Sequence, residues 1–172
     1  MKRRRLPYLR IKRLMWAHEW DAALALLDEF LAQYPNHPHA LTTKGHIFEF
    51  LSAAGDSSRA KRKAFLGSAG RLYRRALRNV THPVGRAAVM RDVGDYLSSV
   101  GQTARAIATY DRALAILASL RRTRASLEWR EELLMSRYLA LRSGTRAKAL
   151  ARSEWQTAQA EIEKRWPSRR AS

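Results

Sequence analysis

The chain has 172 residues, of which 46% are hydrophobic, a length and composition that suit one folded domain with a continuous core. Lys and Arg number 33 against 15 Asp and Glu, and the formal charge of +18 attracts polyanions, whether nucleic acid, acidic protein or anionic membrane. Cysteine is absent, which excludes disulfides, thiolate metal sites and cysteine nucleophiles.

Residues 1–13 form a basic N-terminal segment. Cations at positions 10, 12 and 13 interrupt the apolar core that a secretory signal needs, so no such signal is predicted. The segment is also free of acids, as organellar transit sequences are, but the residues that follow it are expected to pack: Leu14, Met15 and Trp16. We therefore expect a cytoplasmic protein and leave organellar targeting open. No apolar run approaches the ~20 residues that cross a bilayer.

Nearly the whole sequence has helical periodicity and lacks strand-like alternation of β-branched residues, so the predicted class is all-α. Turn signals divide the chain into about eight helices. They fall at residues 34–38, 55–58, 81–83, 101, 121–123 and 143–145. Pro38 and Pro83 stand where a helix can begin. A helix can end in the left-handed conformation at Gly55, Gly101 and Gly144.

Two helix pairs share a spaced pattern of small and aromatic residues. The clearer copy reads Gly94-x-x-Leu97, Gly101 and Ala106-x-x-x-Tyr110-x-x-Ala113. The second copy reads Gly45-x-x-Phe48, Ala69-x-x-x-Tyr73-x-x-Ala76 and a terminal Pro83. Small residues let two helices approach closely, and the aromatic ring fills the space between them. The pattern resembles the tetratricopeptide repeat (TPR).

The resemblance covers about residues 6–166, with weaker copies at both ends, as is usual for the repeats that cap a solenoid. The weaker copies hold His18-Glu19-Trp20-Asp21, Ala23, Leu27 and Pro35 at the start, and Gly144 and Ala149 at the end. The resemblance implies a right-handed solenoid of about four helical hairpins, with about eight antiparallel helices. It implies a single domain over residues 1–172, with a short basic tail at 167–172.

The equivalent alanines at positions 23, 69, 106 and 149 recur at intervals longer than the ~34-residue period of the resembled family. The extra residues are therefore insertions, and those near 56–66 and 119–127 are largely cationic. These basic insertions carry Arg59, Lys61, Arg62, Lys63, Arg121, Arg122 and Arg124.

The helix expected from about residue 59 to 80 has an apolar and a cationic side. Its apolar stripe comprises Phe65, Ala69, Leu72, Tyr73, Ala76 and Val80. A cationic row without carboxylates lies opposite, within an arc of roughly 100°, and comprises Arg71, Arg74, Arg75 and Arg78. This basic ridge is either a solvated face or a docking site for phosphates or carboxylates. The resemblance places it on the convex side, where Arg105 and Arg112 would extend it.

The concave side implied by the resemblance carries mixed rather than uniformly basic residues. Those expected to line this groove are His39, Thr42, His46, Glu49, Arg91, Asp95, Tyr138 and Arg142. The groove lacks the paired Lys and Asn pattern with which some family members hold a C-terminal carboxylate, so no such clamp is predicted. It either takes a peptide or helix of a partner or is shallow and filled by the terminal helix.

No catalytic or phosphate-binding motif is present in the sequence. His37, His39, His46 and Glu49 form a conceivable metal set, but two of these histidines flank a proline in a turn and no Cys or Asp joins them. Tryptophans at positions 16, 20, 129, 155 and 166 could stack on bases, although helical spacing favours burial of the last four. The sequence predicts no enzyme, metal or cofactor site.

Three functions remain open. The first is a protein-interaction scaffold or adaptor, whose groove takes a peptide or helix while its basic ridge orients an acidic partner. The second is an RNA- or DNA-binding protein or nucleoprotein subunit, whose binding should weaken steeply with salt. The third and least favoured is peripheral attachment to anionic lipid through residues 2–13. The sequence favours the first and decides neither the partner's identity nor the oligomeric state.

Overall fold

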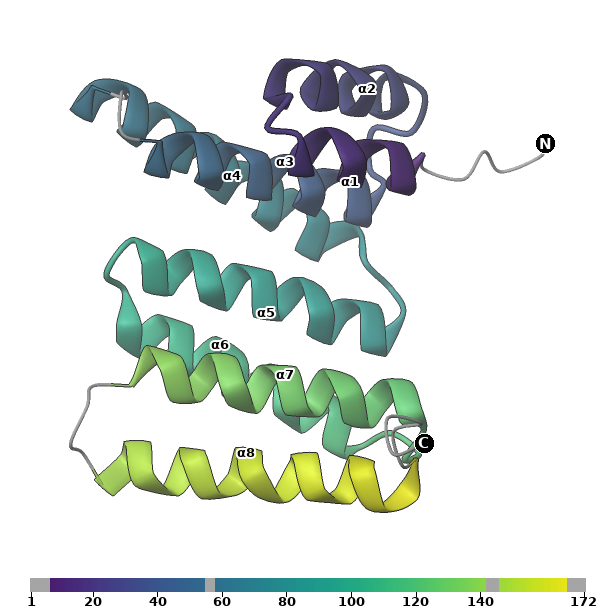
Figure 1. The fold of residues 1–172 in the computed structure, drawn as a ribbon, viewed down its shortest axis with the longest axis vertical. Coiled ribbons are helices and arrows are strands. Elements are labelled where there is room, and N and C mark those ends of the chain that lie inside the picture. The colour runs from purple at the N-terminus through teal and green to yellow at the C-terminus, as the bar shows by residue number, and fades with distance from the viewer. Residues whose placement is uncertain (1–6, 55–57, 142–145, 167–172) are drawn as a thin grey trace. The chain divides into compact units, whose positions relative to one another are not determined.

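The protein is helical throughout the part that the structure, a computed structural model, describes: residues 7–54, 58–141 and 146–166 (Figure 1). This part contains eight helices and no strand, which confirms the predicted all-α class. The helices are α1 Tyr8–Trp16, α2 Trp20–Gln33, α3 Pro38–Ala53, α4 Arg59–Asn79, α5 Pro83–Ser99, α6 Thr103–Ala118, α7 Arg124–Ala140 and α8 Arg146–Arg165. The right-handed solenoid with TPR packing stays a prediction.

Most helix boundaries fall at the predicted turn signals, but the turn at residues 17–19 that separates α1 from α2 has no predicted signal. Pro38 and Pro83 are the first residues of α3 and α5, where the missing N–H costs nothing because first-turn donors have no partner within the helix. Gly101 follows α5 with a φ of +78°, a left-handed conformation that glycine adopts without strain. Gly55 and Gly144, the other predicted helix ends, lie outside the described residues.

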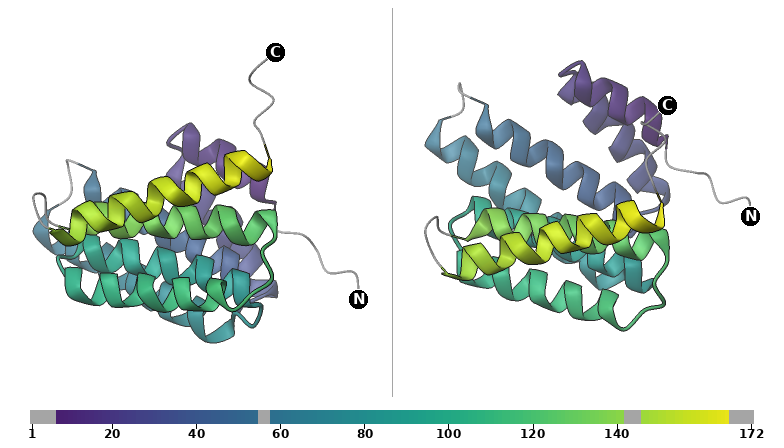
Figure 2. Two further views of the ribbon diagram at one scale, coloured as in Figure 1. Left: turned by 90° about the horizontal axis from the view of Figure 1, so that it is seen from below. Right: turned by 60° about the horizontal axis from the view of Figure 1, so that its bottom comes forward.

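The chain divides into two compact units, residues 1–79 and 80–172, which are described separately. The first unit contains α1 to α4 and the second contains α5 to α8. In the second unit, α5 packs against α6 and α7, and α7 also packs against α6 and α8. Figure 2 shows α7 and α8 side by side. The predicted single domain over residues 1–172 stays a prediction.

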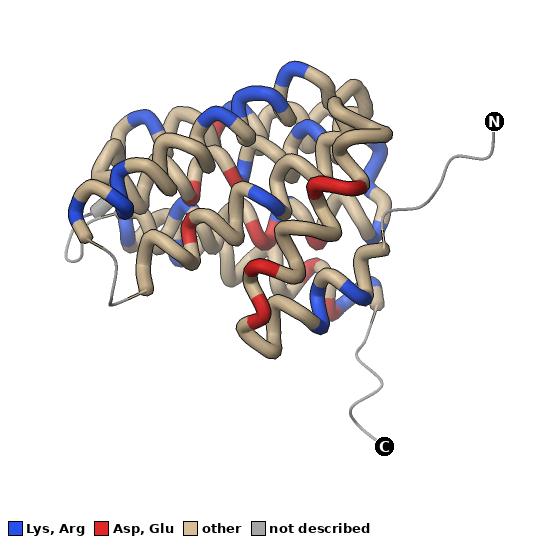
Figure 3. The backbone as a smooth tube through the Cα atoms, turned by 90° about the horizontal axis from the view of Figure 1, so that it is seen from above, with Lys and Arg blue, Asp and Glu red and all other residues tan. Residues whose placement is uncertain are grey.

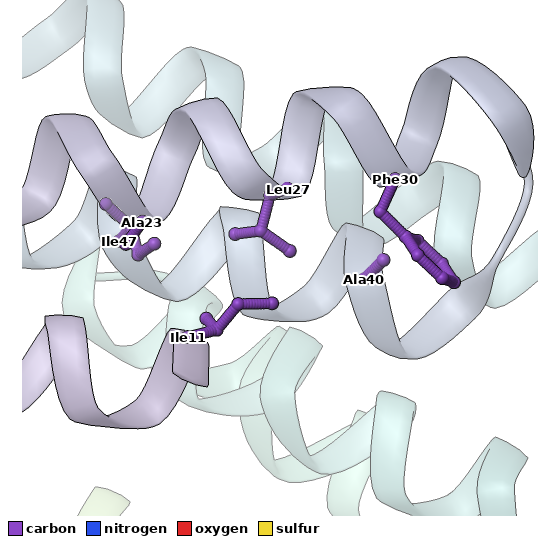
Figure 4. Packing of buried hydrophobic residues seen from close by; sticks show 6 residues of the cluster. All are labelled: Ile11, Ala23, Leu27, Phe30, Ala40 and Ile47. Carbon is purple, nitrogen blue, oxygen red and sulfur yellow. The ribbon is translucent and has the colours of Figure 1, made fainter. Parts of the chain in front are cut away.

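The core of the first unit joins α1, α2 and α3. Its buried cluster comprises Ile11, Ala23, Leu27, Phe30, Ala40 and Ile47 (Figure 4). Leu14 and Met15 pack against this cluster, as expected from the sequence. The predicted packing of Trp16 is wrong, because its side chain is 72% exposed. At ~100° per residue, Trp16 falls on the other side of α1 from the buried Ile11.

In each unit, a glycine on one helix receives a tyrosine ring from the next. A Cβ added at Gly45 would lie 2.7 Å from Tyr73 Cε1, and one added at Gly94 would lie 2.7 Å from Tyr110 Cδ1. Both distances are shorter than side chains tolerate, and both rings are buried. The rings therefore fill the space that the glycines leave, which is the close approach that their spacing in the sequence predicts.

The hydroxyls of these two tyrosines also have partners on the glycine-bearing helices. Tyr73 donates to the Glu49 carboxylate of α3, and Tyr110 donates to Asp95 Oδ1 of α5 at 2.7 Å. A buried phenol needs such a partner, since an unmet hydroxyl costs free energy. The ring and the hydroxyl together fix the rotation of α4 and α6 about their own axes.

Gly94→Ala should lower the free energy of unfolding by about 1–3 kcal/mol, because the new Cβ would overlap the Tyr110 ring and force the helices apart. Gly67→Ala on α4 is the matched control, since its Cβ would meet Arg71 Nη1 at an ordinary 3.6 Å. There, the better helix propensity of alanine should raise stability by about 0.5–1 kcal/mol. Urea denaturation followed by circular dichroism measures both, and equal effects would contradict the glycine–tyrosine contact.

Candidate functional site

Helix α4 carries more positive charges than any other described helix. It contains eight Lys and Arg residues and no Asp or Glu, and all eight side chains are exposed. Its inner side is buried where α4 packs on α3, through Ala69, Gly70, Tyr73 and Ala76. The opposite side therefore faces solvent and carries the basic ridge, Arg71, Arg74, Arg75 and Arg78.

The first basic insertion lengthens α4 at its N-terminal end. The structure places Arg59, Lys61, Arg62 and Lys63 in its first turns. Ser58 Oγ accepts the backbone N–H of Lys61 at 3.3 Å where the helix begins. At ~100° and ~1.5 Å per residue, Lys63 falls within about 20° of Arg74 around the helix but about 16 Å from it along the axis. The first basic insertion therefore adds a second group of cations to α4, which the uncharged residues 64–70 separate from the basic ridge.

The basic ridge has no carboxylate partner among the described residues. Arg71 Nη2 donates to Ser68 Oγ at 3.0 Å, and Arg75 Nε donates to Asn36 Oδ1 at 3.1 Å. Both acceptors are neutral, so the charges remain uncompensated. Figure 3 marks Lys and Arg in blue and Asp and Glu in red on the backbone of the described residues. Like charges three and four residues apart repel, which costs the helix some stability.

The second basic insertion, at residues 121–124, is partly neutralised within the second unit. Arg122 Nη1 lies 2.8 Å from Glu161 Oε1 of α8. Arg124 Nε lies 2.8 Å from Glu128 Oε1, and both of these residues belong to α7. Arg121 is exposed. This insertion therefore offers less free positive charge than α4 does.

Arg105 and Arg112 are exposed on α6, in the second unit. Arg105 Nη1 donates to Gln102 Oε1 at 2.5 Å, and Arg112 Nε donates to the carbonyl of Ala108 at 3.3 Å. Because α4 belongs to the other unit, their predicted continuation of the basic ridge stays a prediction.

The groove residues predicted in the first unit all lie on α3, but they do not share an open surface. His39 is exposed, whereas His46 and Glu49 are half-buried, and the His46 ring lies 5.7 Å from that of Tyr73. Thr42 is buried, and its hydroxyl donates to the His39 carbonyl at 3.1 Å. The expectation that Thr42 lines a groove is therefore wrong, because the residue is only 3% exposed.

In the second unit, Arg91 is the centre of a charged cluster between α5 and α7. Its guanidinium carbon lies 5.0 Å from the ring centroid of Trp129, and its Nη2 lies 3.0 Å from Asp92 Oδ1. It also pairs with Glu132 of α7, and its Nε lies 3.8 Å from Asp95 Oδ2. The Arg91 cluster thus joins two helices and gathers three carboxylates around one cation.

Burial and neighbouring charge oppose each other in the Arg91 cluster. Burial disfavours the charge of Arg91, but the carboxylates, Asp92 first, outweigh it and raise the pKa of Arg91 above its ordinary value. Burial raises the pKa of Asp95, although the Tyr110 hydroxyl and Arg91 act in the other direction. Arg91 therefore stays charged, while Asp95 binds a proton at higher pH than an ordinary Asp does.

Tyr138, another predicted groove residue, packs between α7 and α8. Its ring stacks on that of Trp155 with centroids 5.8 Å apart, and Lys148 Nζ lies 4.9 Å from its centroid. Arg142 lies outside the described residues. The four tryptophans expected to pack, at positions 20, 129, 155 and 166, are half-buried.

The conceivable metal set around His37 does not come together. His37 Nδ1 accepts the backbone N–H of Ala40 at 3.3 Å at the start of α3, and burial lowers the pKa of His37, which favours the neutral ring. The described residues include no group of three or more His, Asp or Glu that could hold a metal ion. Among the described helices, none is long and apolar enough to cross a membrane.

Sequence reasoning placed Arg91 and Asp95 in a groove but missed their partners Trp129 and Glu132. A signal was present, since Arg91 and Asp95 lie four residues apart on α5, and Trp129 and Glu132 lie three apart on α7. Each pair therefore shares one side of its helix. That α5 and α7 are neighbours depends on tertiary packing.

Arg91→Met should lower the free energy of unfolding by roughly 2 kcal/mol, because Asp92 and Glu132 would lose their cation. This loss is smaller than the ~3–5 kcal/mol that it costs to remove one partner of a fully buried ion pair, because the Arg91 side chain is 24% exposed. Arg112→Met on the exposed side of α6 is the control and should change stability by about 0.5 kcal/mol at most. Similar losses for both in urea denaturation would contradict a stabilising role for the Arg91 cluster.

Asp95→Asn should be slightly more stable than the wild type at neutral pH, because the Asp95 side chain is 47% exposed and solvent screens much of the effect of burial, and the difference should vanish in acid. The pKa of Asp95 is higher in the folded than in the unfolded protein, so protonation of Asp95 stabilises the fold. This contribution is complete below the pKa of the unfolded protein and is lost as the pH rises through the raised pKa of the folded protein. Asn imitates the protonated form at every pH. Urea denaturation across that pH range measures the difference, and a less stable Asp95→Asn at neutral pH would contradict the raised pKa.

Comparisons of this chain with protein-family models, curated proteins and solved structures found no match. The TPR resemblance therefore rests on the glycine, alanine and tyrosine pattern of the sequence. The surfaces with distinct chemistry are the basic ridge of α4 and the Arg91 cluster, and a function must be argued from these.

Proposed function

We propose that the chain is a non-enzymatic interaction scaffold of the TPR type that binds an acidic macromolecule along the basic ridge of α4. The observation that carries this proposal is the exposure of eight cations on one helix that has no carboxylate of its own. The described acceptors of Arg71 and Arg75 are neutral, so these two guanidinium groups keep their full charge for a partner. A surface of this kind attracts polyanions and supplies charge-assisted hydrogen bonds.

The pairing of arginines elsewhere supports a binding role for the basic ridge over a merely solvated face. In the second unit, Arg91, Arg124 and Arg137 each have a carboxylate partner. A high arginine content is therefore compatible with internal neutralisation in this chain. On α4, repulsion along the ridge destabilises the helix until an anion arrives, and binding would remove that repulsion.

The scaffold's peptide groove is best supported on the α5 and α7 side of the second unit. There, the side chains of Asp95 and Glu132 are 47% and 40% exposed beside Arg91. Partly exposed carboxylates held in place by a cation suit the N–H and cationic groups of a peptide or helix. The two surfaces therefore prefer opposite charges.

RNA or DNA is the second candidate partner, favoured by the distance over which α4 carries cations. The two groups of cations, at residues 59–63 and 71–78, together span about 28 Å at ~1.5 Å per residue. Duplex DNA carries one negative charge per ~1.7 Å of its axis, so several phosphates would lie within reach. Arginine suits them because its planar guanidinium makes two-point contacts with phosphate.

The test is a titration of the intact, nuclease-treated protein with polyglutamate, single-stranded RNA and duplex DNA at two salt concentrations. The variant in which Arg71, Arg74, Arg75 and Arg78 become Gln should bind its preferred polyanion about a hundredfold more weakly. Because each neutralised phosphate releases a counterion, the salt slope for nucleic acid should fall by about 3 to 4.

A matched control removes four exposed cations elsewhere and so has the same net charge. In this variant, Gln replaces Arg86, Arg121, Arg152 and Lys164. It should lose far less affinity than the basic-ridge variant. Equal losses would show that net charge alone attracts the polyanion, and the absence of binding to all three probes would contradict the proposed function. Tightest binding to polyglutamate favours an acidic protein partner, and tightest binding to RNA or DNA favours the second candidate.

A further inference from the structure

Helix α1 has an outer side that combines cations with exposed apolar side chains. Leu9 and Trp16 are each 72% exposed. Three exposed cations share this side, and α1 contains no Asp or Glu. This α1 outer side comprises Leu9, Arg10, Lys12, Arg13 and Trp16, whereas the Tyr8 ring packs against His39 of α3, with centroids 4.9 Å apart.

The inner side of α1 is already used by the fold. Ile11 is fully buried, and Leu14 and Met15 pack against the core of the first unit. A membrane anchor that inserted these residues would have to leave that core. Lipid attachment through a basic amphipathic start, as the sequence suggests, therefore cannot use the apolar side of α1 in the folded protein. Any lipid contact falls to the outer side.

We infer that the α1 outer side binds the surface of a bilayer that contains anionic lipid. Its cations attract anionic headgroups, while the Trp16 ring favours the headgroup region and Leu9 reaches the acyl boundary. Lys12 Nζ lies 4.7 Å from the ring centroid of Trp16, so a cation and a ring that favour the interface stand together. This surface is independent of the basic ridge, since it lies on another helix and uses apolar contacts as well as charge.

Leu9 distinguishes a lipid partner from a nucleic acid. Phosphates would engage Arg10 and Lys12, and bases would stack on Trp16, but neither contact uses an exposed aliphatic side chain. An acidic protein would need carboxylates and a shaped pocket for each apolar group. An anionic bilayer supplies charge and an apolar boundary along one plane, without shaped pockets.

Co-sedimentation of the full chain with lipid vesicles tests this inference. We expect binding to phosphatidylcholine vesicles that contain about 30 mol % phosphatidylglycerol, and much weaker binding to phosphatidylcholine alone. Replacing Leu9 and Trp16 together by Ser leaves the net charge unchanged. It should weaken partitioning about ten- to hundredfold, because the buried apolar area is lost.

The matched control replaces Leu139 and Leu150 by Ser, since these leucines of α7 and α8 are 64% and 59% exposed. This variant should bind vesicles as the wild type does. Lipids brominated in the acyl chain give a direct readout, because they should quench the fluorescence of Trp16. Trp16→Phe should keep the binding and lose that part of the quenching, while circular dichroism checks that each variant is folded.

Several results would overturn the inference. One is the absence of binding to the anionic vesicles, and another is an equal loss of binding in the two double-Ser variants. Loss in the basic-ridge variant with full binding in the Leu9 and Trp16 variant would assign the lipid contact to α4. Failure of the basic ridge to bind polyanions would leave this inference intact. The α1 outer side lies on another helix, and its test changes apolar side chains while every cation is kept.

Discussion

The close contact between a glycine and a tyrosine ring governs the arrangement of α3 with α4 and of α5 with α6. Gly45 admits Tyr73, and Gly94 admits Tyr110, so the second helix of each pair is held at one distance and one rotation. With Tyr73 turned inward, the arginines of α4 that lie across the helix from it must turn outward. The same contact that stabilises this pair thus determines which side of α4 is available to a partner.

The chain uses its arginines in two different ways. Arg91 and Arg137 lie between helices, where carboxylates of neighbouring helices neutralise them and where they contribute to stability. The arginines of the basic ridge have neutral acceptors or none that is described, and they lower the stability of α4 in the absence of an anion. The excess of positive charge is therefore concentrated where it is accessible, which suits recognition more than folding.

The helical class, most helix boundaries and the basic ridge could be predicted because they depend on local signals, whereas the turn at residues 17–19 between α1 and α2 was missed. Pro38, Pro83 and Gly101 act within their own turns, and the relative angles of the ridge arginines follow from spacing along one helix. The partners of Arg91 could not be predicted, because they come from a helix that only tertiary packing brings near. Trp16 was expected to be buried from its hydrophobic character, but the burial of Ile11 turns it outward.

The most direct test of the central claim is to observe each arginine side chain while a polyanion binds. Arginine Nε–H signals, assigned by nuclear magnetic resonance, can be followed as polyglutamate or single-stranded RNA is added. The account predicts that the signals of Arg71, Arg74, Arg75 and Arg78 shift first, while those of the internally paired Arg91 and Arg137 stay in place. Uniform shifts over all exposed arginines, or earlier shifts in the second unit, would contradict it.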